Sequence, residues 1–130
     1  MIEKDREIRV AREFAISLAM PVFIVDPEGS LLFYNKAVEK ILGRRFEETG
    51  TMGASVWSRL FYPTDADGAP IFPEKLPLMI ALHEHRPAHD QFWIRGLDNV
   101  AREIEVTAFP LITQNNEFVG AIAIFWDVKH

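Results

Sequence analysis

Three histidines lie close together in the sequence and are the residues best suited to bind a metal. His83, His85 and His89 fall within seven residues, and imidazole nitrogens bind zinc, copper and haem iron. In a helix, however, His83 and His85 point in different directions, and the neighbouring Glu84 and Arg86 are typical of a solvated helix end. We therefore expect no metal site. His83 is the best candidate for haem ligation among the three, because it continues the apolar face of the preceding helical segment.

Few other groups have the pattern of a catalytic or metal site. Asp65-Ala66-Asp67-Gly68 lacks the Gly and Glu that a calcium loop needs further along, and its composition is that of a turn. The absence of cysteine excludes disulfides, thiolate nucleophiles, cysteine zinc sites and light-driven cysteinyl adducts. Because no Ser-His-Asp order, phosphate-binding glycine loop or paired carboxylates on a strongly patterned element occurs, we expect no catalytic residues and no enzyme.

Aromatic side chains are the remaining candidates for binding a cofactor. Trp57, Phe61, Phe92 and Trp93 could enclose a planar ring such as flavin or haem. In a small domain, however, large aromatic side chains usually pack in the core. Haem and flavin are therefore not expected, and the sequence implies no other cofactor.

The composition limits the possible partners. A length of 130 residues, of which 48% are apolar, suits one domain with one buried core. The net charge is -5 with both signs interspersed, so no basic stripe is available for nucleic acid. No apolar run approaches the roughly 20 residues that span a bilayer, and the N-terminal residues are unlike a secretory signal. We expect a cytoplasmic protein with neither nucleic acid nor membrane as partner.

The first residues favour an amphipathic helix. Glu3 to Ala19 contains no Gly or Pro, and its apolar residues recur at spacings of three and four. We interpret residues 1–19 as a dimerisation or linker helix in front of a domain at residues 20–130. Small alanines in the apolar stripe allow close helix contact, so the stripe is the candidate homodimer interface, formed by Ile8, Ala11, Ala15 and Leu18.

The rest of the sequence predicts a sheet interrupted by short helices. Five runs have strand character: Val22–Asp26, Leu31–Tyr34, Ala88–Arg95, Val100–Phe109 and Glu117–Val128. Pro27-Glu28-Gly29-Ser30 joins the first two as a hairpin, and Asn35 suits the N-cap of a following short helix. Another helix is expected over Glu74–Glu84. The order predicts an α+β fold with a five-stranded antiparallel sheet and short helices on one face.

The ordered set of these segments resembles the PAS domain family, and in particular the sensory PAS domains of bacterial regulators. The match begins with the hairpin that contains Asp26 and Gly29, followed by Asn35 at the next helix start. It continues through three further segments: Asp67-Gly68-Ala69-Pro70, Ala108-Phe109-Pro110-Leu111 and Asp127-Val128. At the end, the family's Asp-Ile-Thr signature appears as Asp127-Val128-Lys129.

The resemblance implies a sensory module with a cavity between a concave sheet and the short helices. Its signal would leave through the sheet or flanking helices to a second copy, or to a downstream effector domain or protein. Haem-binding relatives take their axial histidine from the region of His83. With Trp93 and Phe125 as alternatives to Phe92 and Ile122, the candidate cavity residues are Trp57, Leu76, Met79, Ile80, Phe92, Ile104, Val106, Ile122 and Ile124.

Three functions remain open on the sequence alone. An apolar cavity with few charges favours a small apolar or aromatic ligand. Ten Phe and three Trp could instead fill the cavity, which would leave a ligand-free interaction and dimerisation module. A haem or flavin sensor is the third alternative.

Overall fold

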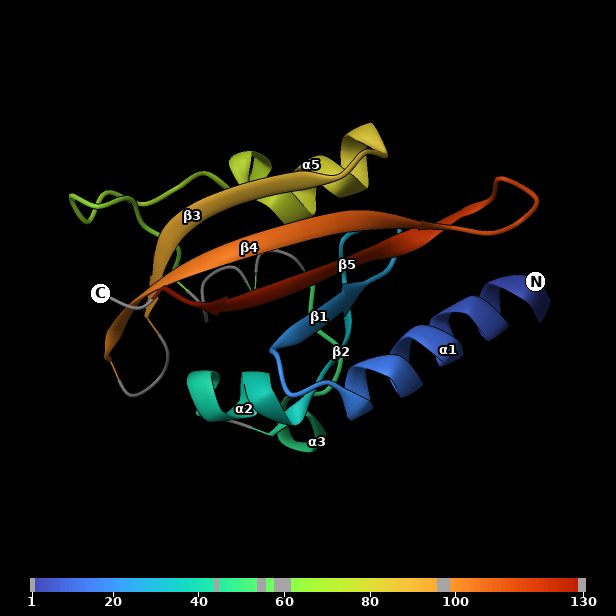
Figure 1. Cartoon of the computed structure of the whole chain (residues 1–130), viewed down its shortest axis with the longest axis horizontal. Coiled ribbons are helices and arrows are strands. Elements are labelled where there is room, and N and C mark those ends of the chain that lie inside the picture. The colour runs from blue at the N-terminus through green and yellow to red at the C-terminus, as the bar shows by residue number, and fades with distance from the viewer. Residues whose placement is uncertain (1, 44, 54–55, 58–61, 96–98, 129–130) are drawn as a thin grey trace.

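The fold is one antiparallel sheet with helices on both of its faces (Figure 1). The computed structural model describes residues 2–43, 45–53, 56–57, 62–95 and 99–128. The strands lie in the order β2-β1-β5-β4-β3, and each neighbouring pair is antiparallel. They are β1 (Val22–Val25), β2 (Leu31–Tyr34), β3 (Ala88–Arg95), β4 (Ala101–Ile112) and β5 (Phe118–Asp127).

Short helices connect β2 to β3, and a longer helix precedes the sheet. The helices are α1 (Ile2–Ser17), α2 (Lys36–Leu42), α3 (Phe46–Thr49), the 3-10 helix η1 (Pro73–Lys75) and α5 (Pro77–Glu84). The predicted α+β fold, with five antiparallel strands and helices inserted after the second, is confirmed. Among the described residues, none of the helices has the length and apolar character needed to cross a lipid bilayer.

The helix predicted over Glu74–Glu84 is divided in two. A 3-10 turn ends at Lys75, and α5 begins at Pro77. Leu76 between them is extended, with ψ at 142°, because the ring of a following proline disfavours the helical conformation. Pro77 then occupies the first turn of α5, where a missing N–H costs nothing.

The sheet separates two hydrophobic cores. The inner core lies between the sheet and the short helices, and in β4 it receives Ile104, Val106 and Ala108, as the alternation in the sequence predicted. The outer core lies between the sheet and α1. Its buried members are Ala11, Ala15, Val22, Ile24, Phe33 and Ile122.

Two tight contacts fix the hairpin at the end of β1. The Asp26 carboxylate accepts hydrogen bonds from the backbone N–H groups of Glu28 at 3.0 Å and Ser30 at 2.9 Å. On the other side of β1, Gly120 of β5 lies so close that a Cβ there would overlap the carbonyl oxygen of Val25. Gly120 also has a φ of 144°, which side chains with a Cβ rarely adopt. The close pairing of β1 with β5 therefore requires glycine.

Asn35 joins three elements through one buried side chain. It is the N-cap of α2, where its Oδ1 accepts from the N–H of Val38 at 3.3 Å and also from the N–H of Val22 at 3.1 Å. Its Nδ2 donates to the carbonyls of Ala15 at 2.9 Å and Met20 at 2.8 Å, at and just beyond the end of α1. Asn35 thus connects α1, β1 and α2.

We predict that Asn35→Ala lowers the free energy of unfolding by about 2–4 kcal/mol, because several buried backbone groups lose their partner. Loss of an N-cap alone typically costs about 1 kcal/mol. Urea denaturation followed by circular dichroism measures the difference.

Asn35→Asp separates the two roles of this side chain. Aspartate caps a helix as well as asparagine does, but it has no N–H to donate and places a carboxylate against the carbonyls of Ala15 and Met20. The Asn35→Asp protein should therefore lose about as much stability as the Asn35→Ala protein. An Asn35→Asp protein as stable as the original would show that the connection to α1 contributes nothing.

Candidate functional site

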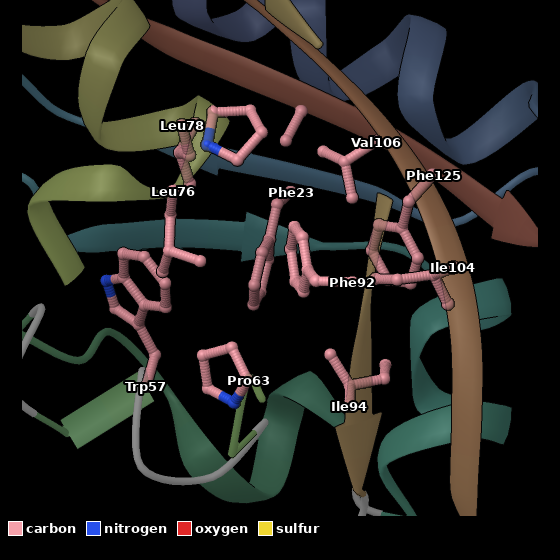
Figure 2. A pocket seen from close by; sticks show the side chains of 12 residues that line it. Phe23, Trp57, Pro63, Leu76, Leu78, Phe92, Ile94, Ile104, Val106 and Phe125 are labelled. Atoms are coloured by element: carbon pink, nitrogen blue, oxygen red, sulfur yellow. The ribbon is translucent and has the colours of Figure 1, made fainter. Parts of the chain in front are cut away.

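A cavity of about 50 Å³ lies in the inner core, between the sheet and the start of α5. Figure 2 shows the rings of Phe23 and Phe92 projecting into this space from the sheet, with Leu76 and Trp57 across from them. The strands β1, β3, β4 and β5 and the start of α5 therefore build most of the wall. The described residues of the wall are Phe23, Trp57, Pro63, Leu76, Pro77, Leu78, Phe92, Ile94, Ile104, Val106, Ala123 and Phe125.

The described part of the wall offers a ligand no charge and no free hydrogen-bonding side chain. Its one side-chain N–H, Nε1 of Trp57, donates to the carbonyl oxygen of Gly29 at 2.9 Å. Among the described residues, no buried side-chain nitrogen or oxygen lacks a hydrogen-bond partner. A polar ligand would lose its hydration without gaining partners. The cavity is therefore suited to an apolar molecule or to remaining empty.

Five of the nine residues predicted from the sequence line the cavity: Trp57, Leu76, Phe92, Ile104 and Val106. Met79 is buried in the inner core, and Ile80 is half-buried on α5, but neither reaches the wall. Because α5 begins at Pro77, the residues that approach the cavity are Leu76, Pro77 and Leu78 rather than the next turn of the helix.

The prediction was wrong for Ile122 and Ile124, which lie on the outer side of the sheet. Val106 pairs with Phe125, and Ala108 pairs with Ala123. Directly paired residues share a face of the sheet, so Ala123 and Phe125 point inward. Since β5 is apolar on both faces, the sequence held no polar residue to show which face was which.

Sequence reasoning also missed Phe23, Pro63, Pro77, Leu78 and Ile94 in the wall. Ile94 had a usable signal, because it lies two residues from Phe92 in the same strand and two-residue spacing keeps side chains on one face. Phe23 had none: β1 consists of four consecutive buried apolar residues. Pro63 lies in a stretch without periodicity, where no pattern predicts side-chain direction.

Comparison with known proteins identifies the fold and its family. The family model of the PAS domain matches residues 19–130. The chain belongs to the PAS domain family. PAS domains are generally sensory and signalling modules. The resemblance detected in the sequence is thereby confirmed.

Solved structures are similar to this domain in fold at low sequence identity. The PAS domain of Bordetella pertussis BvgS has a TM-score of 0.65 and 14% identity, with 95% of this chain and 87% of that chain covered. The Rhodobacter sphaeroides LOV protein has a TM-score of 0.73 and 11% identity, with 96% and 69% covered. The PAS domain of the fruit-fly ELK potassium channel has a TM-score of 0.71 and 10% identity, with 95% and 97% covered. None of the curated proteins matches the sequence.

In this PAS domain the apolar stripe of α1 packs on the sheet of its own chain. Ala11 and Ala15 are buried in the outer core, and Ile8 and Leu18 are half-buried against it. The small alanines permit close approach, as predicted, but the surface they approach is the sheet. While α1 is docked, this stripe is not free to form the homodimer contact that the sequence suggested. The side chain of Ala15 has no exposed surface at all.

The three histidines of the PAS domain do not converge. His83 is exposed on α5 and does not line the cavity. His85 stacks on Phe118, with ring centroids 4.0 Å apart. His89 lies 3.6 Å from the Glu105 carboxylate, measured from Nε2 to Oε2. Within the part of the chain that the structure describes, no three His, Asp or Glu residues are grouped to hold a metal ion.

We expect the purified PAS domain to show no Soret absorption band, because the described cavity wall presents no histidine to an iron atom. An absorption spectrum of the native protein tests this. A Soret band that disappears in His83→Ala and persists in the control His85→Ala would contradict the placement of His83 outside the cavity.

Proposed function

We propose that this PAS domain is a sensory module that responds to a small apolar or aromatic molecule in its inner cavity. The observation that carries the proposal is the cavity wall, which is built from twelve apolar residues of the sheet, α5 and the segments between them. Among the residues that the structure describes, no acid, base or nucleophile lines it, which favours binding over catalysis. The response would pass to a second copy or to a downstream effector protein or domain.

The size of the cavity determines how a ligand would act. Ligand pockets usually measure about 300–1,000 Å³, whereas about 50 Å³ is open here. A ligand of ordinary size must therefore displace side chains, and the rings of Phe23 and Phe92 occupy the space it would take (Figure 2). Occupation of the cavity and movement of these rings would be the same event.

A second candidate is a ligand-free interaction and dimerisation module, which the small open volume favours. This function needs a free apolar surface, and α1 has one away from its docked stripe. Val10 is 53% exposed and Phe14 is 56% exposed. Four residues apart, they adjoin on one side of the helix. Ile16, 66% exposed, lies on the other side, where it borders grooves lined by Leu32 and other residues.

Helical periodicity directs Val10 and Phe14 toward β4. Ile16 borders grooves over β2, and β4 lies on the opposite side of the central pair β1 and β5. On the outer face of β4, Phe109 and Leu111 are half-buried beside the outer core. We propose that these two residues of α1 and these two of β4 supply the apolar surface that a protein contact covers. We place the homodimer contact here, instead of on the buried stripe.

The ligand proposal predicts that the domain, purified without denaturation, retains a small apolar molecule. Mass spectrometry of the solvent extract detects it. Independently, indole added at a hundredfold excess over its Kd should stabilise the fold by about 2.7 kcal/mol.

Ala123→Val tests whether the molecule occupies the cavity. The substitution adds two methyl groups to the wall, in a strand that accommodates a β-branched residue. This variant should retain less of the molecule and gain less stability from indole. No retained molecule, together with no stabilisation by indole, would reject the ligand proposal in favour of the ligand-free module.

The dimer proposal predicts a dimeric mass by light scattering at micromolar concentration. Phe14→Glu should give a monomer, since a carboxylate in an apolar contact loses its hydration. Ile16→Glu, at a similarly exposed position on the other side of α1, should remain dimeric. A monomeric mass for the unmodified protein would refute the dimer, and equal effects of the two substitutions would refute its location.

A further inference from the structure

Phe46, at the start of α3, packs against both cores. The sheet otherwise separates them, and among the described apolar residues Phe46 is the one shared by the two sets of packing contacts. It lies beside β2, which is an edge strand of the sheet. We infer that Phe46 couples the state of the cavity to the docking of α1, by a route around the sheet edge and not through the sheet.

The contacts of Phe46 with β2 reach both faces of that strand. Phe33 and Tyr34 are consecutive and therefore point to opposite faces, Phe33 into the outer core and Tyr34 into the inner core. The Phe46 ring meets Phe33 edge-on at 5.3 Å and Tyr34 edge-on at 5.4 Å between centroids. Its backbone N–H donates to the Glu39 carboxylate at 3.0 Å, so α2 holds this residue in place.

From Tyr34, ring contacts continue to the cavity wall. Tyr34 meets Phe23 at 5.9 Å, and Phe23 meets Trp57 at 5.6 Å, both edge-on. Phe23 and Trp57 line the cavity. Aromatic pairs of this geometry have preferred orientations. A change in the Phe23 ring is therefore transmitted to Tyr34 and from there to Phe46.

From Phe33, the contacts continue to α1. The Arg12 guanidinium lies over the Phe33 ring, with Cζ 4.9 Å from its centroid, which is within the range of a cation–π interaction. The buried residues of α1 in the outer core are the alanines Ala11 and Ala15, and alanine side chains contribute little burial energy. Ile8, which is half-buried, adds to the apolar packing, and the cation–π contact of Arg12 contributes beside it. A shift of Phe33 alters docking of α1, because Phe33 takes part in both kinds of contact.

Docked and released α1 are the two states that this route would influence, and coupling requires such an element. The inference concerns the side chains of the cavity wall and needs no ligand. It would stand if no ligand of the cavity were found, because its test perturbs the wall by substitution.

The test compares the effect of Phe23→Leu on α1 with and without the Phe46 ring. Hydrogen exchange of the amides of residues 6–17 is measured relative to that of β5. In the otherwise unmodified protein, Phe23→Leu should accelerate exchange in α1 by roughly 2- to 30-fold, the usual range of coupling between sites. In the Phe46→Leu background, the same substitution should add no further acceleration. Phe46→Tyr, which keeps the ring, should restore the full response.

Matched controls separate this route from general loosening of the core. Ile104→Val shortens another wall residue that makes none of the ring contacts above, and it should leave α1 unchanged relative to β5. Ile41→Ala removes a half-buried residue of α2 that packs on the inner core alone, and the response to Phe23→Leu should persist in it.

Two results would overturn the inference. The first is an equal acceleration by Phe23→Leu in the Phe46→Leu and unmodified backgrounds, which would assign the coupling to the sheet. The second is no acceleration of α1 in any background. Should Phe46→Leu fail to fold, the exposed substitution Arg12→Gln interrupts the same route at its far end. The response to Phe23→Leu must then be lost in the Arg12→Gln background, and its persistence there would refute the route.

Discussion

Burial of β1 and β5 on both of their faces is the constraint on which the rest of the molecule depends. All four residues of β1 are buried, and β5 alternates between Ile122 in the outer core and Ala123 in the inner core. Exposure of either face would leave a large apolar surface in water. The short helices cover one face and α1 covers the other (Figure 1). Both cores are therefore needed for one sheet.

The contact between α1 and the sheet combines a small apolar core with polar contacts at one end of the helix. Two alanines bring the helix close to the strands, and close approach leaves the carbonyls at the end of α1 near the start of β1. Asn35 satisfies those carbonyls and the N–H of Val22 together. Hydrogen bonds between buried groups are costly to break. A helix fixed in this way is held firmly at one end, while its remaining contacts are modest.

The cavity and the aromatic ring contacts are two consequences of the same composition. Large aromatic side chains fill an inner core of this size incompletely, and the residual space adjoins Phe23 and Phe92. Those rings are in turn packed against others that continue past the edge strand to Phe33 and Arg12. Closely packed interiors transmit displacement. The cavity and the aromatic ring contacts are therefore directly connected in this domain.

The sequence by itself determined the element order, the hairpin at Asp26 and the capping position of Asn35, because these depend on local conformation. It also determined the inward face of β4, because polar and apolar residues alternate clearly in that strand. Only the tertiary structure decided which face of β5 meets the cavity, because both faces are apolar and pairing with β4 sets the choice. The tertiary structure also decided that the α1 stripe packs on the sheet of its own chain, because the sequence pattern of an amphipathic helix does not specify which apolar surface it covers. The position of Phe46 at the sheet edge arises from contacts between segments distant in sequence, and no local pattern encodes those.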